Sequence, residues 1–95
     1  MPHKIIFSDQ AAEKLILIFN DIETRFGKRS KDLVKKEFQK TIISASIFPE
    51  IGKIYEKHLR YVIVKKRSIL FYRFENNTMY IVAVFSSKEN WMSKI

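Results

Sequence analysis

Hydrophobic positions in the first third of the chain change from a short continuous run to a helical period. Lys4–Phe7 is a β-prone run, and Ser8 with Asp9 supplies an N-cap and a carboxylate for the positive end of a helix. Spacings of three and four then predict a helix over Asp9–Phe26, and Gly27 stands where a left-handed C-cap belongs. The apolar positions that carry this period are Ala12, Leu15, Ile16, Phe19, Ile22 and Phe26.

A second helical pattern follows a short basic connector. Lys28 and Arg29 form the connector, and Ser30 is a candidate N-cap for the second helix. We expect this helix to end at Phe48 and Pro49, because a residue before proline is disfavoured in helical backbone. Two helices with so short a connection should form an antiparallel hairpin. The apolar positions of the second helix are Val34, Phe38, Ile42 and Ala45.

The last third of the chain changes to a pattern that is typical of strands. Leu59–Val64, Ile69–Phe74 and Met79–Phe85 are rich in β-branched and aromatic residues. The separators, Lys65–Ser68 and Glu75–Thr78, are short enough for tight hairpins. The predicted fold class is therefore α+β: a short N-terminal strand, an antiparallel helix hairpin, and a three-stranded antiparallel meander packed on the helices. The N-terminal strand can join an edge of this sheet.

The predicted register gathers polar side chains on one face of the sheet. With two-residue turns, Arg60 lies opposite Arg73, and Arg73 lies opposite Tyr80. Two facing arginines repel unless an anion lies between them, so this cluster is a candidate phosphate or carboxylate site. The alternative is that the arginines are solvated or pair with Glu56 or Glu75. The helices should pack on the opposite face, which carries Leu59, Tyr61, Ile63, Leu70, Tyr72, Phe74, Met79, Ile81 and Ala83.

Composition limits the class of protein. The chain has 95 residues, of which 46% are hydrophobic, and its two Gly and two Pro are too few for a flexible linker, so we expect a single domain over residues 1–95. It has no cysteine and only two histidines, which excludes disulfides and argues against a metal site. No signal peptide or membrane-spanning run is recognisable. We expect a cytoplasmic protein with no cofactor and no membrane partner.

The net charge of +8 favours an anionic partner. The excess is concentrated, because Lys53–Arg73 contains seven basic residues and one acidic residue. The run Lys65, Lys66 and Arg67 can contact phosphates, although charged hairpin tips also serve solubility. A second group, at the start of the second helix, can steer an anionic partner or form an ordinary solvated face; it comprises Lys28, Arg29, Lys31, Lys35 and Lys36.

Two further side chains have both a functional and a structural interpretation. His58 precedes Arg60 and can act as an acid or base near neutral pH, or it can be an incidental surface histidine. Trp91 can stack on a nucleic-acid base, or it can anchor the C-terminal segment.

The order of these features resembles the RelE/ParE superfamily of bacterial toxins. The resemblance extends from Lys4 to Trp91, and it depends on the order and spacing of motifs that are individually weak. After the helix hairpin these are Phe48-Pro49-x-x-Gly52, Leu59-Arg60, Ile69-Leu70-Phe71-Tyr72-Arg73, Val82-Ala83-Val84-Phe85 and Asn90-Trp91.

The resemblance implies the toxin of a type II toxin–antitoxin module, a growth inhibitor held in a hetero-oligomer by a cognate antitoxin that should be acidic. RelE-like members cut messenger RNA in the ribosome, whereas ParE-like members inhibit DNA gyrase. Because both activities share one fold, the fold alone cannot identify the target. A non-toxic nucleic-acid-binding or regulatory module with the same fold is a further alternative.

The residues that match the nucleolytic members are incomplete. Arg60 matches the arginine early in its strand, and Lys88 stands where many members have arginine. Ile69 occupies a position at which several nucleases have arginine, and the C-terminal segment lacks their His-Tyr pair. The candidate catalytic set is therefore Arg60, Arg73, Tyr80 and Lys88. These departures favour a ParE-like or other non-nucleolytic toxin, with RelE-like cleavage as the alternative.

Overall fold

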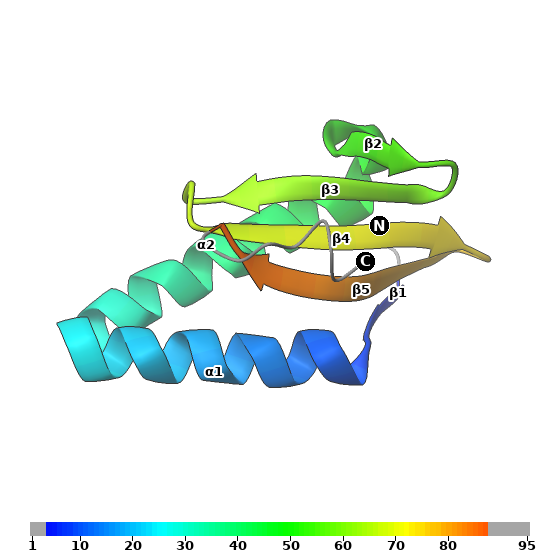
Figure 1. Ribbon diagram of the computed structural model, residues 1–95. Helices are drawn as coiled ribbons and strands as arrows, with labels where there is room; N and C mark the ends of the chain where they lie inside the picture. Colours follow the sequence, from blue (N-terminus) through cyan, green and yellow to red (C-terminus); the bar gives the residue numbers. More distant parts are fainter. Residues whose placement is uncertain (1–3, 88–95) are drawn as a thin grey trace.

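Two helices cover one face of a five-stranded sheet in the computed structural model, which describes residues 4–87 (Figure 1). The strand order is β1-β5-β4-β3-β2, and β1 is parallel to β5 while the other neighbours are antiparallel. Within the described residues, no helix has the length and apolar character that crossing a membrane requires. The elements are β1 (Lys4–Phe7), α1 (Asp9–Phe26), α2 (Lys28–Ile47), the 3-10 helix η1 (Pro49–Ile51), β2 (Lys53–Glu56), β3 (Leu59–Val64), β4 (Ser68–Glu75) and β5 (Thr78–Ser86).

The junction between β1 and α1 also ties the helix to the sheet. The Ser8 hydroxyl caps α1 by accepting from Ala11 N at 3.1 Å, and it donates to the Val82 carbonyl at 2.6 Å. The Gln10 side chain exchanges two 3.1 Å hydrogen bonds with the backbone of Val84, as a neighbouring strand would. The predicted limits of β1 and α1, and the Ser8 cap, are confirmed.

The predicted start of the second helix after Ser30 is wrong. Gly27 has φ +94° and reverses the chain within one residue, so α2 begins at Lys28. The Gly27 carbonyl accepts from Lys31 N at 3.2 Å, and Ser30 lies inside the first turn. The predicted end is confirmed, because α2 stops at Ile47, before Phe48 and Pro49.

The sheet contains a strand that was not predicted. Lys53–Glu56 forms β2, a four-residue strand at the edge of the described sheet that pairs with β3, where an irregularity separates Ile54 from Glu56. Its hydrophobic signal is short, which is why it resembles a loop in the sequence. The N-terminal strand joins the opposite edge through β5, as the sequence suggested.

The β3–β4 hairpin differs from the predicted two-residue turn. Val64 pairs with Ser68, so three residues connect the strands, and Arg67 N donates to the Val64 carbonyl at 3.1 Å. Lys65 and Lys66 both have positive φ, at 53° and 59°, which costs side chains other than glycine or asparagine about 1 kcal/mol each. This shift by one residue reverses the two faces of β3. Val62 and Val64 therefore face the helices, and Leu59, Tyr61 and Ile63 do not.

The β4–β5 hairpin begins as predicted and then contains a bulge. Asn76 and Asn77 form a two-residue turn with positive φ, and Arg73 pairs with Tyr80. The register shifts between Phe71 and Tyr72, which leaves Val82 as an extra residue on β5. Val84 consequently joins the helix-facing core, and Ala83, which was predicted to face the helices, lies on the other face.

Two hydrophobic clusters result, one on each face of the sheet. Helix residues contribute only to the first. The buried members of the first cluster are Ala11, Leu15, Phe38, Ile42, Ala45, Val64, Leu70, Tyr72, Met79, Ile81 and Val84, and those of the second are Ile69, Phe71, Ala83 and Phe85.

Candidate functional site

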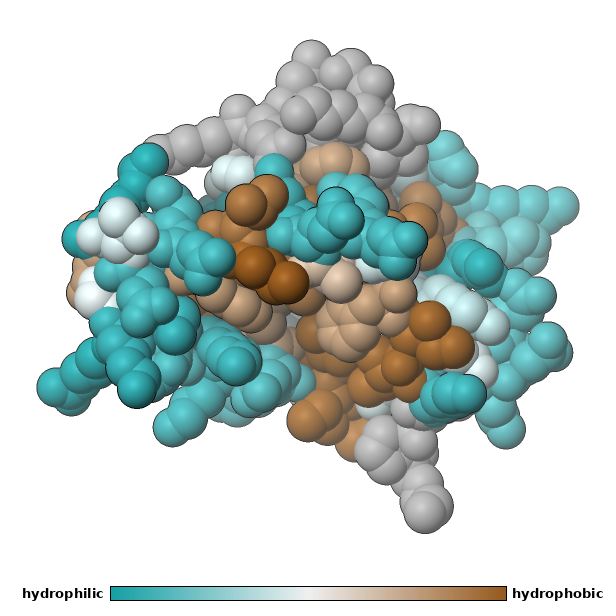
Figure 2. Space-filling view, turned by 90° about the horizontal axis from the view of Figure 1, so that it is seen from below, coloured by the Kyte–Doolittle hydropathy of each residue, from teal (hydrophilic) through white to brown (hydrophobic). Residues whose placement is uncertain are grey.

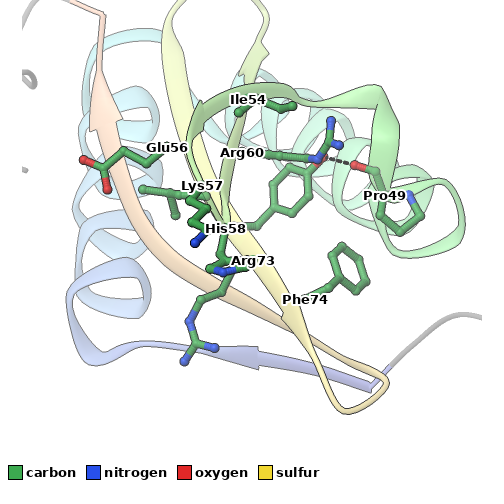
Figure 3. Close-up of a pocket in the computed structure, with 10 residues that line it drawn as sticks. Pro49, Ile54, Glu56, Lys57, His58, Arg60, Arg73 and Phe74 are labelled. Atoms are coloured by element: carbon green, nitrogen blue, oxygen red, sulfur yellow. Dashed lines mark hydrogen bonds between the residues drawn. The ribbon is translucent and has the colours of Figure 1, made fainter.

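A pocket of about 210 Å³ lies where β2, β3 and β4 meet η1 (Figure 3). Its basic side chains come from the β2–β3 turn and from the two strands that follow. The pocket thus collects three of the predicted site residues, His58, Arg60 and Arg73. The complete lining is Pro49, Ile54, Glu56, Lys57, His58, Leu59, Arg60, Tyr72, Arg73 and Phe74.

Arg60 and Arg73 do not form the predicted pair. Because of the three-residue β3–β4 connection, Arg60 lies opposite Tyr72 and belongs to the helix-facing side of the sheet. Figure 3 shows the Arg60 side chain directed towards Pro49, whereas the Arg73 guanidinium points away from it. The two arginines approach one pocket from opposite faces of the sheet and do not face each other across a ladder.

Arg60 and Tyr72 together hold the segment that enters β2. The Tyr72 hydroxyl donates to the Pro49 carbonyl at 2.7 Å and accepts from Gly52 N at 2.9 Å. Arg60 Nη1 donates to the Gly52 carbonyl at 2.8 Å. We call this set of hydrogen bonds the Gly52 clamp. It fixes η1 against the sheet and uses the Arg60 guanidinium for support of the backbone.

Position 52 requires glycine because the Tyr72 side chain lies close to it, and not because its φ is unusual. An added Cβ would lie 2.2 Å from the Tyr72 hydroxyl oxygen, and Tyr72 is fully buried. From the sequence, Gly52 was placed in a motif after the second helix and Tyr72 on the helix-facing side of the sheet, but the two residues were not connected. The signal was the Phe48-Pro49-x-x-Gly52 motif together with a hydroxyl at a core position, since a buried hydroxyl needs partners.

Burial raises the pKa of Tyr72 above its ordinary value of 10.0, while the hydrogen bond from Gly52 N and the charge of Arg60 oppose that rise. Since the pKa of Tyr72 is higher in the folded state than in the unfolded state, the neutral Tyr72 hydroxyl stabilises the fold below about pH 10. This stabilisation is lost as the pH rises above that value.

We expect Tyr72→Phe to lower the free energy of unfolding by about 1–3 kcal/mol at neutral pH, because Pro49 and Gly52 lose their partner. The difference between wild type and variant should narrow as the pH rises above about 10, because only the wild type has this hydroxyl to ionise. Urea denaturation across this pH range measures the difference. A difference that stays constant would contradict the raised pKa.

Arg73 already has local partners. Its guanidinium carbon lies 4.4 Å from the centre of the Tyr80 ring, and Arg73 Nη1 forms an ion pair with Glu75. The predicted contact with Tyr80 is confirmed, and so is the alternative pairing with Glu75. Arg73 remains partly exposed at the pocket, so it can still contact an anionic group.

The remaining predicted residues lie elsewhere. Lys65, Lys66 and Arg67 are at the opposite end of β3 from the pocket, whereas His58 is exposed in the β2–β3 turn at the pocket itself. Lys88 and Trp91 lie outside the described residues. Within residues 4–87, no three His, Asp or Glu side chains gather closely enough to hold a metal ion.

The sheet face that turns away from the helices is aromatic. The Phe71 ring lies 5.3 Å from the ring of Tyr55, 5.7 Å from that of Tyr61 and 6.0 Å from that of Phe85. The side chains that continue this face towards the pocket are Arg73 and Tyr80. This arrangement offers an electropositive pocket beside an aromatic face, which suits recognition of an acidic surface.

Comparison with known proteins agrees with this architecture. A solved chromosomal ParDE toxin–antitoxin system from P. aeruginosa superposes with a TM-score of 0.74 over 88% of this chain and 95% of that chain, at 10% sequence identity. At that identity the likeness shows a shared fold. No curated protein sequence matches this chain at a significant level. The sequence profile of the ParE toxin of type II toxin–antitoxin systems, parDE, matches residues 5–91. Because this match spans nearly the entire chain, the protein belongs to the ParE toxin family of type II toxin–antitoxin systems.

Proposed function

We propose that this toxin acts in the cytoplasm by inhibiting DNA gyrase and that a cognate acidic antitoxin neutralises it. Family membership identifies a type II toxin component. The ParE-like members that the sequence resembles inhibit DNA gyrase. The observation that carries the choice of gyrase over messenger RNA is the position of Arg60.

RNA cleavage requires a base, an acid and cations that converge on one phosphate. The Arg60 guanidinium is instead bound to the Gly52 carbonyl on the helix-facing side of the sheet. On the other face, Phe71 and its neighbours form an aromatic cluster, and Arg73 is paired with Glu75. Among the described residues, Arg60 is therefore held on the opposite side of the sheet from Arg73 and Tyr80, and this separation supports inhibition by binding.

Exposed hydrophobic residues support a protein partner. Figure 2 shows hydrophobic residues gathered in the middle of the face that α1 crosses. A second exposed series runs from the end of α2 through η1 into β2 and comprises Ile43, Ile47, Phe48, Ile51 and Ile54. Exposed apolar surface of this extent is typical of protein-binding proteins. An antitoxin with apolar and acidic side chains would complement this surface and the positive charge.

We expect purified toxin to block the supercoiling of relaxed plasmid by gyrase and to leave messenger RNA intact in a translating extract. Arg73→Ala should raise the half-inhibitory toxin concentration about tenfold, which corresponds to about 1.4 kcal/mol. Lys36→Ala, which removes the same charge from the exposed side of α2, is the matched control and should have little effect.

The two targets give opposite results in these assays. New messenger RNA ends in register with codons, together with unaffected supercoiling, would overturn the gyrase proposal in favour of RNA cleavage. If Arg73→Ala and Lys36→Ala weakened the inhibition of gyrase equally, the pocket would have no specific role and net charge alone would explain the effect.

A further inference from the structure

Two hairpin ends that are far apart in the sequence lie at the same end of the molecule. Figure 1 shows the α1–α2 junction and the β3–β4 turn on the left, away from the β2–β3 and β4–β5 turns. The guanidinium carbon of Arg67 lies 5.9 Å from the centre of the Phe26 ring and joins them. We call this region the basic end; its cations are Arg25, Lys28, Arg29, Lys31, Lys65, Lys66 and Arg67.

Most of this charge is not neutralised by neighbouring carboxylates. Arg25 pairs with Asp21 at 3.0 Å, and Lys31 pairs with Glu23 at 3.1 Å. Within residues 4–87, the other cations of the basic end make no side-chain ion pair. All five of them are exposed and carry the excess: Lys28, Arg29, Lys65, Lys66 and Arg67.

The start of α2 places cations where helix electrostatics disfavour them. Lys28 and Arg29 are in the first turn, at the positive end of the helix dipole, and that turn contains no acidic residue. The N-cap is Gly27, which provides no side-chain hydrogen bond to the free backbone N–H groups. An anion placed outside this turn would relieve both defects.

The β3–β4 turn shows a second, independent defect. Lys65 and Lys66 occupy the left-handed region, in which the two-residue β4–β5 turn has Asn76 and Asn77. Asparagine tolerates this conformation and an Asn-Gly pair is preferred for it, whereas adjacent lysines are strained and repel each other. Sequences that break local rules twice at one surface commonly do so for a function.

We propose that the basic end binds the phosphate backbone of double-stranded DNA. The exposed cations come from two separate hairpin ends, which suits an extended polyanion better than a single small anion. Phosphate backbones are bound by Lys and Arg without an apolar groove, whereas amphipathic protein segments need one. The exposed hydrophobic series of α2, η1 and β2 is a separate surface. Exposed Phe26, at 59%, adds an aromatic ring beside the cations. This goes beyond the proposed function, because it holds whether or not gyrase is the target.

The test measures the anisotropy of a short labelled DNA duplex against the full-length toxin at increasing salt. Neutralisation of about four phosphates predicts a log–log slope of affinity against salt of about −4. Lys65→Asn combined with Lys66→Gly should reduce the slope by about 2 and weaken binding at least about tenfold at low salt. The same variant should melt at a higher temperature than wild type, because Asn-Gly is the preferred turn sequence.

The matched control removes two exposed lysines from the outer side of α2, through Lys36→Gln and Lys40→Gln. It has the same net charge as the turn variant and should keep the wild-type slope. Equal losses in both variants would overturn the proposal, as would unchanged binding in the turn variant. Stronger turn-dependent binding to polyglutamate or to anionic lipid vesicles than to DNA would also overturn it, by identifying a different partner.

Discussion

Replacing Val64 with aspartate is expected to leave the protein largely unfolded, whereas the same replacement at the adjacent Ile63 should leave it folded. Val64 is 1% exposed and belongs to the cluster that packs the helices on the sheet. Burial of an unpaired carboxylate there costs several kcal/mol, which is comparable to the whole stability of a small domain. Ile63 is 57% exposed, so its substitution should change stability by about 0.5 kcal/mol or less.

Circular dichroism and urea denaturation of the two variants measure this difference. They also test the register of β3, because the two-residue turn predicted from sequence would place Ile63 against the helices and Val64 on the other face. If Ile63→Asp proved the more damaging substitution, the three-residue connection between Val64 and Ser68 would be wrong.

Gly52→Ala is expected to lower the free energy of unfolding by about 3 kcal/mol, although alanine is small and the φ of Gly52 is −77°. The new methyl group would lie 2.2 Å from the Tyr72 hydroxyl oxygen and 2.7 Å from its ring carbon Cζ. Tyr72 cannot move aside easily, because its ring is buried and its hydroxyl holds both Pro49 and Gly52. Relief of the clash would break the Gly52 clamp.

Gly27→Ala is the matched control for this substitution. No atom of residues 4–87 lies within 4 Å of a Cβ at Gly27, but its φ of +94° strains any other residue, so we expect a loss of about 1 kcal/mol. Midpoints of urea denaturation rank the two variants. If the Gly52→Ala variant were as stable as the Gly27→Ala variant, the contact between position 52 and Tyr72 would not be close.

Several parts of this fold could be predicted from the chemistry of residues close together in the sequence. The limits of α1 follow from its helical period, from the Ser8 cap and from the backbone freedom of Gly27. The end of α2 follows from the backbone restriction before Pro49, and the β4–β5 turn follows from two adjacent asparagines. These signals act within a few residues, so they are readable without knowledge of the rest of the chain. At the site, the contact of Arg73 with Tyr80 follows from this turn.

Only the tertiary structure decided the faces of β3, the bulge in β5 and the construction of the pocket. Each depends on the number of residues in a turn or a bulge, because one extra residue moves every following side chain of a strand to the other face. Because Lys65–Arg67 forms a three-residue connection and not the predicted two-residue turn, Arg60 does not lie opposite Arg73. Arg60 instead donates a hydrogen bond to the Gly52 carbonyl. The same folding brought Lys65 and Lys66 to the end of the molecule where α2 begins. The positive charge is encoded by residue types alone, but its division between a pocket and a basic end required contacts between distant segments.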